Sequence, residues 1–404
     1  MPPPFFAFAT SLPSPSLLPP HHRRSLRTIK TLVDSTAGSR PTSALPPPIE
    51  SLRGGNWVKL ICGASFEDAA DVRNLSLVYT LAGVDCIDCA ADASVVNAVN
   101  EGIDAAMSIA AVQRPWVMIS VNDDKEDLHF RKAEFDPEDC PSDCARPCEV
   151  VCPANAISLE RVTVGNELAG NANASGKLQV GVITERCYGC GRCFSVCPYD
   201  RIRAITYVRD PSTTSKLLKR NDVDAIEIHT NGRCTDLFNE LWNRLGDSID
   251  HVKLVSLDGR PMSGDIGGGA TREAIAFAVH LASTLDKPCG FYQLAGGTNS
   301  HTINHLKKVG LFQTTAISGH SSDTSGAAQS TGLEQALIGG IAYGGYARKI
   351  VGRVLRKMPT QHGHAKIEDY PEHFLEALQE ALALVGPVKC YSMPFVLPKQ
   401  TTSM

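Results

Sequence analysis

The sequence lacks several features that would assign it to a familiar class at once. No apolar run in its 404 residues approaches the ~18 uncharged residues of a membrane helix, so we expect no membrane span. A formal net charge of −4 offers no positive field for nucleic acid. The glycine-rich loop SGDIGGGATREA has neither the Lys–Ser/Thr pair of a P-loop nor the spacing of a dinucleotide fingerprint.

A recognisable catalytic set is missing as well. No general base stands beside an obvious nucleophile, and no Lys/Asp/His set on neighbouring predicted strands dictates a reaction. The sequence therefore leaves open whether the protein is an enzyme.

Acidic residues are absent from the N-terminal segment before Asp34. This segment is rich in serine and proline and has four basic residues from Arg23 to Lys30, which is typical of an organelle transit peptide. We expect residues 1–50 to be a plastid transit peptide and a disordered linker, and the protein to reside in the chloroplast stroma. The alternative is a disordered tail with no targeting role. A secretory signal is disfavoured because no continuous apolar stretch precedes a cleavage site.

Cysteine, by contrast, is plentiful, with 14 residues in the chain. Eight of them form two local runs, whereas disulfide-rich secreted domains are short and spread their cysteines along the whole chain. Local runs in a stromal protein favour reduced thiolates that hold metal. We interpret Cys62, Cys234 and Cys289 as small core residues. We read Cys86 and Cys89 in the same way, since they lie in an apolar strand rather than at a helix N-terminus.

The second run, Cys187-x2-Cys190-x2-Cys193-x3-Cys197-Pro198, has the spacing of a bacterial-type ferredoxin and predicts a [4Fe–4S] cluster. Zinc is the alternative metal, but a zinc site uses two separated cysteine pairs rather than three evenly spaced thiols and a Cys-Pro.

The first run has wider and equal gaps: Cys140-x3-Cys144-x3-Cys148-x3-Cys152-Pro153. In two-cluster ferredoxins the fourth cysteine of each run binds the other cluster, and both runs here end in x3-Cys-Pro. We therefore assign Cys140, Cys144, Cys148 and Cys197 to cluster 1, and Cys187, Cys190, Cys193 and Cys152 to cluster 2. The alternative is a single cluster with unused thiols.

The rest of the chain alternates apolar runs with helical patterns, which predicts an α/β fold with a parallel sheet. The predicted strands are WVKLICGAS, VDCIDCAAD, RPWVMISVND, VDAIEIHTNG, IDHVKLVSLDG, KPCGFYQLAGG, FQTTAISG and Gly340–Tyr343. We expect a (β/α)-barrel-like, TIM-barrel-type domain built from residues 56–125 and 220–358. A two-[4Fe–4S] ferredoxin-type domain is inserted at 130–210, and residues 366–404 form a C-terminal helix and tail. An open doubly wound sheet is the alternative.

Glycine-rich turns follow two late strands of the predicted barrel. Gly296, Gly297 and Thr298 lie in one turn, and Gly344 and Gly345 lie in the other. Exposed backbone N–H groups in such turns can hold the phosphate of a substrate or a flavin, although nothing in the sequence specifies a flavin. The alternative is that these glycines only form tight turns.

Several segments taken together resemble a known family. The cysteine block CPSDCARPCEVVCP and CYGCGRCFSVCP precedes a region with AGGTNSHT, SGHSSDTSG and GGIAYGGYARKIV. This order of parts, from about Trp57 to Leu355, resembles the light-dependent period protein family, which consists of cyanobacterial iron–sulfur proteins with relatives in plant plastids. The resemblance implies a redox-responsive role. The cyanobacterial members report photosynthetic redox state to the circadian clock, a role that we do not transfer to a plastid relative.

Three functions are compatible with these observations. The first is a non-catalytic redox sensor or electron relay with redox proteins as partners. The second is an iron–sulfur oxidoreductase, with or without a flavin, that acts on a phosphate-bearing or small substrate at the barrel mouth. In the third, the clusters only stabilise the fold. We favour the first, because no catalytic set accompanies the cluster cysteines.

Overall fold

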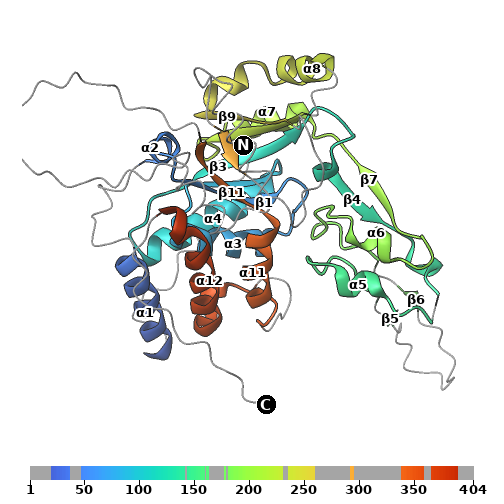
Figure 1. Cartoon of the computed structure of the whole chain (residues 1–404), viewed down its shortest axis with the longest axis horizontal. Helices are drawn as coiled ribbons and strands as arrows, with labels where there is room; N and C mark the ends of the chain where they lie inside the picture. The colour runs from blue at the N-terminus through green and yellow to red at the C-terminus, as the bar shows by residue number, and fades with distance from the viewer. Residues whose placement is uncertain are drawn as a thin grey trace, which may run out of the picture.

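One parallel β-sheet organises the part of the chain that the computed structural model describes (Figure 1). The described residues are 20–36, 47–141, 143–159, 161–162, 177–178, 181–230, 235–259, 292–294, 338–358 and 365–389. The strands of the sheet are β1 (Trp57–Gly63), β2 (Cys86–Ala90), β3 (Trp116–Asn122), β8 (Ala225–Thr230), β9 (Leu254–Gly259), β10 (Tyr292–Leu294) and β11 (Ile338–Tyr343).

The strand order is that of a barrel opened between two strands. The order is β10-β11-β1-β2-β3-β8-β9, and every neighbouring pair is parallel. The last strand, β11, therefore lies beside the first, while β9 and β10 are the two edges of the sheet among the described residues. The sheet is also curled, because Lys59 of β1 reaches Glu227 of β8 across three strand spacings, about 14 Å in a flat sheet. The α/β prediction is confirmed as a curled half-barrel.

The strands form where the sequence has near-continuous apolar runs. Both faces of β2 are buried, as its pattern CIDCA shows no exposed position, and parallel strands covered on both faces have this composition. All the predicted strands that lie in the described residues are present. The predicted strand FQTTAISG lies outside them.

Helices cover the outer face of the sheet, with α3, α4, α11 and α12 grouped on one side in Figure 1. Asp68 and Asp92 cap α3 and α4 by accepting hydrogen bonds from backbone N–H groups in the first turn, which satisfies donors that a helix start leaves unpaired. The helices that flank the sheet are α2 (Pro48–Arg53), α3 (Ala69–Leu81), α4 (Ala93–Ile109), α7 (Pro211–Leu218), α8 (Thr235–Leu245), η4 (Gly246–His251), α11 (Gly345–Leu355), η5 (Ile367–Asp369) and α12 (Pro371–Lys389).

The N-terminal segment contains a helix that the sequence composition did not indicate. Helix α1 (Pro20–Thr36) contacts α12, and its Ile29 and Val33 are buried in the main core. Targeting by this segment stays a prediction. Among the described helices, α1 included, none combines the length and apolar character needed to cross a membrane.

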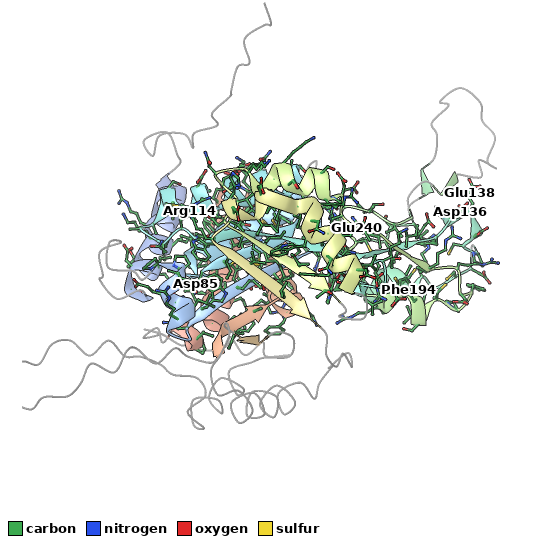
Figure 2. The ribbon with its side chains drawn as sticks, turned by 90° about the horizontal axis from the view of Figure 1, so that it is seen from above. Asp85, Arg114, Asp136, Glu138, Phe194 and Glu240 are labelled. Atoms are coloured by element: carbon green, nitrogen blue, oxygen red, sulfur yellow. The ribbon has the colours of Figure 1, made fainter. Side chains whose placement is uncertain are left out.

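The cysteine runs lie on an excursion that leaves the sheet after β3 and returns at β8, which is the hydrogen-bonded neighbour of β3. Its first and last strands pair antiparallel, and it projects to one side of the sheet (Figure 1). From above, the excursion residues Phe194, Asp136 and Glu138 lie at the opposite end of the molecule from Asp85 and Arg114 (Figure 2). The excursion consists of η2 (Leu128–Phe130), β4 (Arg131–Glu134), η3 (Pro137–Asp139), α5 (Pro147–Val151), β5 (Arg161–Val162), β6 (Lys177–Leu178), α6 (Arg192–Val196) and β7 (Arg203–Thr206).

Candidate metal centres and the buried polar row

The eight clustered cysteines line two separate hollows, four in each. The first hollow is lined by Cys140, Cys144, Cys148 and Cys197. The second hollow is lined by Cys187, Cys190, Cys193 and Cys152. The fold thus brings together the same two sets of four that the crossed pattern predicts.

The two hollows are built by a pseudo-symmetric pair of short helices. Helix α5 contains Cys148 and α6 contains Cys193, and the residues that precede the helices, Arg146 and Gly191, both have positive φ angles. Positive φ angles recur three residues after the fourth cysteine of each run, at Asn155 and Asp200. Two runs with different spacing therefore follow the same path around their hollows.

Backbone N–H groups point at the sulfur atoms in both hollows. Around the second hollow, the backbone N–H of Ala133 donates to Cys187 Sγ at 3.2 Å, and that of Ala156 donates to Cys152 Sγ at 3.2 Å. Around the first hollow, the N–H of Arg146 donates to Cys144 Sγ at 3.4 Å, and that of Arg201 donates to Cys197 Sγ at 3.4 Å. N–H donors of this kind stabilise thiolate sulfur and tune the potential of an iron–sulfur cluster.

The pKa values of these thiols also indicate that the hollows suit a cationic ligand. Burial and the neighbouring Cys190 and Cys187 raise the pKa of the Cys193 thiol to about 12, because several thiolates repel one another in a small space. Burial also opposes ionisation of Cys197, but the backbone N–H groups of Arg201 and Tyr199 outweigh it and lower the pKa of that thiol. A bound cation would remove the repulsion and hold all four sulfurs as thiolates.

One predicted glycine turn lies close to the second hollow. Gly344 follows β11, which ends at Tyr343, and α11 begins at Gly345; the other turn, Gly296 to Thr298, lies outside the described residues. In the first turn of α11, Arg348 donates to the carbonyl oxygen of Cys62 at 2.5 Å. Its guanidinium carbon lies 4.1 Å from the ring centroid of Tyr188, the residue after Cys187. The turn is thus linked to a cysteine loop through one stacked side chain.

Ion pairs join the cysteine-bearing excursion to the loop after β1. Arg186 forms an ion pair with Asp68 at 2.9 Å. Glu67 forms ion pairs with both Lys132, at 2.8 Å, and Arg209, at 2.6 Å. The ring of Tyr188 also meets Phe66 edge to face, with centroids 6.2 Å apart. The second hollow therefore adjoins the sheet domain directly.

The structure also contains a buried polar row that the sequence analysis missed. Lys59 pairs with Glu227 on the concave side of the sheet, and Ser120 donates to Asp88 at 2.6 Å between them. Burial and the Glu227 carboxylate raise the pKa of Asp88 to about 7. Burial alone would lower the pKa of Lys59, but the carboxylates of Glu227 and Asp88 outweigh it and raise that pKa. The sequence did contain a sign of this row, because Lys59 and Glu227 are charged residues inside the apolar strand segments WVKLICG and AIEIHT.

The remaining thiols in the described strands behave as predicted. Cys62, Cys86 and Cys89 are fully buried, and burial raises the pKa of each. They are core residues that make no part of either hollow.

Comparison with known proteins agrees with this arrangement. A family model described as the LdpA Fe-S cluster-binding domain matches residues 140–208, the part of the chain that holds all eight clustered cysteines. A second model, the Light dependent period A C-terminal domain, matches residues 217–257 and 256–387. The chain is 36% identical over 372 residues to "Light dependent period A" of Synechococcus elongatus (strain ATCC 33912 / PCC 7942 / FACHB-805), a match that covers 85% of this chain and 94% of the relative. The chain therefore belongs to the light dependent period A family and has its iron–sulfur cluster-binding domain.

Proposed function

We propose that the protein holds two [4Fe–4S] clusters in crossed cysteine sets and uses them to sense redox state or relay electrons in the plastid. The observation that carries the proposal is the partition of the eight cysteines between two hollows, with Cys197 beside the first run and Cys152 beside the second. This exchange of fourth cysteines is the ligand pattern of two-cluster ferredoxins. The excursion between β3 and β8 would then be an inserted ferredoxin-type domain.

The residues present fit such clusters. Each hollow offers four sulfur donors and backbone N–H groups aimed at them, and soft thiolates select iron–sulfur clusters or zinc among the first-row metals. When bound, the clusters supply one-electron transfer. The chain's own contribution is to fix the sulfur positions, exclude solvent and set the potential through hydrogen bonds and nearby charge.

A sensing role is supported by the contacts of the second hollow. Tyr188 lies between Phe66 and Arg348, so a change of charge in this hollow acts directly on residues of the sheet domain. A light-linked redox role also agrees with the name of the Synechococcus relative, which states dependence on light. Residence in the chloroplast stroma, with redox proteins as partners, rests on the transit-like N-terminal composition.

Exchange of single cysteines tests the crossed arrangement. Replacing Cys197 by serine should disturb the cluster of the first run, and Cys152→Ser should disturb that of the second, because each removes one sulfur from the opposite hollow. Iron content and EPR spectra of the reduced, anaerobically purified protein measure this, with about half of the iron expected to stay intact in each variant. Cys89→Ala, which alters a buried thiol outside both hollows, is the control. If Cys197→Ser perturbs only the cluster of its own run, the crossing is wrong, and if wild type holds only about four irons, the two-cluster proposal is wrong.

Hydrogen exchange distinguishes a sensor from a simple relay. On reduction of the holoprotein we expect altered protection at residues 64–68 and in the first turn of α11, because both contact the loop that carries Tyr188. Helix α7, which does not contact that loop, is the internal control. Changes confined to residues 131–206 would instead support electron relay without signalling to the sheet domain.

A second candidate is an iron–sulfur oxidoreductase, which the buried polar row favours. Lys59, Asp88 and Glu227 form a convergent group of buried polar side chains on the concave side of the sheet, and buried titratable groups with a perturbed pKa are candidates for reactive groups. An Asp88 carboxyl with a pKa of about 7 is suited to general acid–base chemistry near neutral pH. Turnover of a phosphate-bearing or small substrate, dependent on Asp88, would favour this reading.

A further inference from the structure

A compact group of two histidines and a carboxylate lies where the cysteine-bearing excursion leaves the sheet. Asp127, His129 and His229 each place a ligand atom within 4.8 Å of the others. His129 Nδ1 lies 3.1 Å from one oxygen of Asp127, and His229 Nδ1 lies 3.1 Å from the other. None of the eight cysteines takes part, so the group is chemically separate from the proposed clusters.

The backbone fixes this group from two directions. Asp127 begins the turn η2 and accepts a hydrogen bond from the backbone N–H of His129 at 2.8 Å. His229 lies near the carboxyl end of β8, and the ring of Phe130 packs edge to face against it, with centroids 5.2 Å apart. Asp127 and His129 therefore come from the turn η2 and its cap, and His229 comes from strand β8.

A carboxylate lies behind His229. Glu227 Oε1 lies 3.9 Å from His229 Nε2, the ring nitrogen that does not face Asp127, and Glu227 is itself held by the buried Lys59. At 3.9 Å this is an ion-pair distance rather than a hydrogen bond. A small shift of either side chain would give the carboxylate–histidine contact by which proteins orient a metal-binding histidine.

The exposure of the three side chains suits an open site. His229 and Asp127 are 9% and 13% exposed, whereas His129 is 52% exposed. Two of the three side chains are thus nearly buried and the third is exposed, so solvent reaches one side of the group. Three protein ligands with open positions characterise catalytic rather than structural metal sites.

From these contacts we propose that Asp127, His129 and His229 bind one divalent first-row transition metal ion, with Glu227 and Lys59 as its supporting shell. Two histidines and one carboxylate are the donor set of mononuclear non-haem iron sites, and the set also accepts manganese, cobalt and zinc. The site lies next to β4, whose Ala133 donates to Cys187. His129 and that donor are four positions apart in the chain, a span of at most about 14 Å. A redox-active ion here would lie close to the second hollow.

Manganese titration of the holoprotein tests this site, because Mn²⁺ prefers oxygen and nitrogen donors to thiolates. We expect wild type to bind one Mn²⁺ per chain, followed as loss of the EPR signal of free Mn²⁺ with the protein oxidised, and Zn²⁺ to displace it. Asp127→Asn and His229→Gln should each weaken binding at least about 100-fold. Glu227→Gln should weaken it about 10- to 100-fold, as expected for a supporting group.

The control is His251→Gln, at an exposed histidine on η4 whose Nδ1 lies 3.2 Å from a backbone carbonyl oxygen; Mn²⁺ affinity should not change. Iron content and the unfolding temperature of each variant report on folding, and His129→Gln, on the exposed side, decides the matter if His229→Gln does not fold. The proposal is overturned if wild type binds no stoichiometric Mn²⁺, or if variants of Asp127 and the two histidines bind it as wild type does. Because iron content is read separately, loss of this site and loss of the clusters are distinguishable.

Discussion

Replacement of Lys59 by methionine should destabilise the protein by about 3–5 kcal/mol. The Lys59 and Glu227 side chains are 3% and 8% exposed, so removing the ammonium leaves a buried carboxylate without its counter-charge. Asp88 lies in the same row, and it would add to the repulsion. The expected result is a lower midpoint of urea unfolding with an unchanged dependence on denaturant, measured by circular dichroism.

Two further variants make this result specific. Lys59→Met combined with Glu227→Gln should recover much of the lost stability, because the Glu227 carboxylate is then no longer buried without its counter-charge. Lys357→Met removes a lysine that also pairs with a carboxylate, Glu376, at 2.6 Å, but these two side chains are 55% and 46% exposed; the cost should stay within about 1 kcal/mol. A double variant no more stable than Lys59→Met would show that Lys59 and Glu227 are not energetically coupled.

Replacement of Gly189 by alanine should remove the cluster of the second hollow and about half of the bound iron. Gly189 has a φ of +69°, and a Cβ atom there would lie 2.2 Å from the backbone oxygen of Arg131 in β4. An alanine would therefore suffer both the strain of a left-handed backbone, about 1–3 kcal/mol, and a contact that only movement of β4 could relieve. Iron per chain and the EPR spectrum of the reduced protein measure the effect.

Gly191 offers a matched comparison in the same loop. Its φ of +76° imposes the same backbone strain, but the nearest atom to its added Cβ is the guanidinium end of Arg131, at 2.6 Å. Because a side-chain end can move aside, Gly191→Ala should retain more iron than Gly189→Ala. Equal iron loss in the two variants would mean that backbone strain alone, and not the contact with β4, controls assembly of this hollow.

The strands and the path of the cysteine loops could be predicted because their signals are local. An apolar run such as that of β2 specifies a buried strand, and the spacing around Cys187 specifies the path of a short loop. The crossing of Cys152 and Cys197 needed one further rule, the exchange of fourth cysteines in paired runs, and the hollows follow the same partition.

The polar row and the histidine group could not be predicted because their members meet only in the folded chain. Lys59 and Glu227 are 168 residues apart, and each is a single charged residue within a predicted apolar strand. The pair Asp127 and His129 has no visible partner until β8 places His229 beside it. Helix α1 was missed for a different reason, since its basic and serine-rich composition fits a targeting segment as well as a helix whose Ile29 and Val33 are buried.

The excursion returns to the strand beside the one it leaves, and this affects how loss of iron is related to unfolding of the sheet. The backbone N–H of Val117 in β3 donates a hydrogen bond to the side chain of Asp224, just before β8, across 107 positions of sequence. Strands β3 and β8 are therefore joined directly and not only through the excursion between them. Loop-closure entropy grows only with the logarithm of loop length, and a slack excursion therefore adds little to the cost of pairing β3 with β8. We therefore expect loss of iron and loss of the sheet to be separate events, with the sheet of an iron-free chain remaining folded.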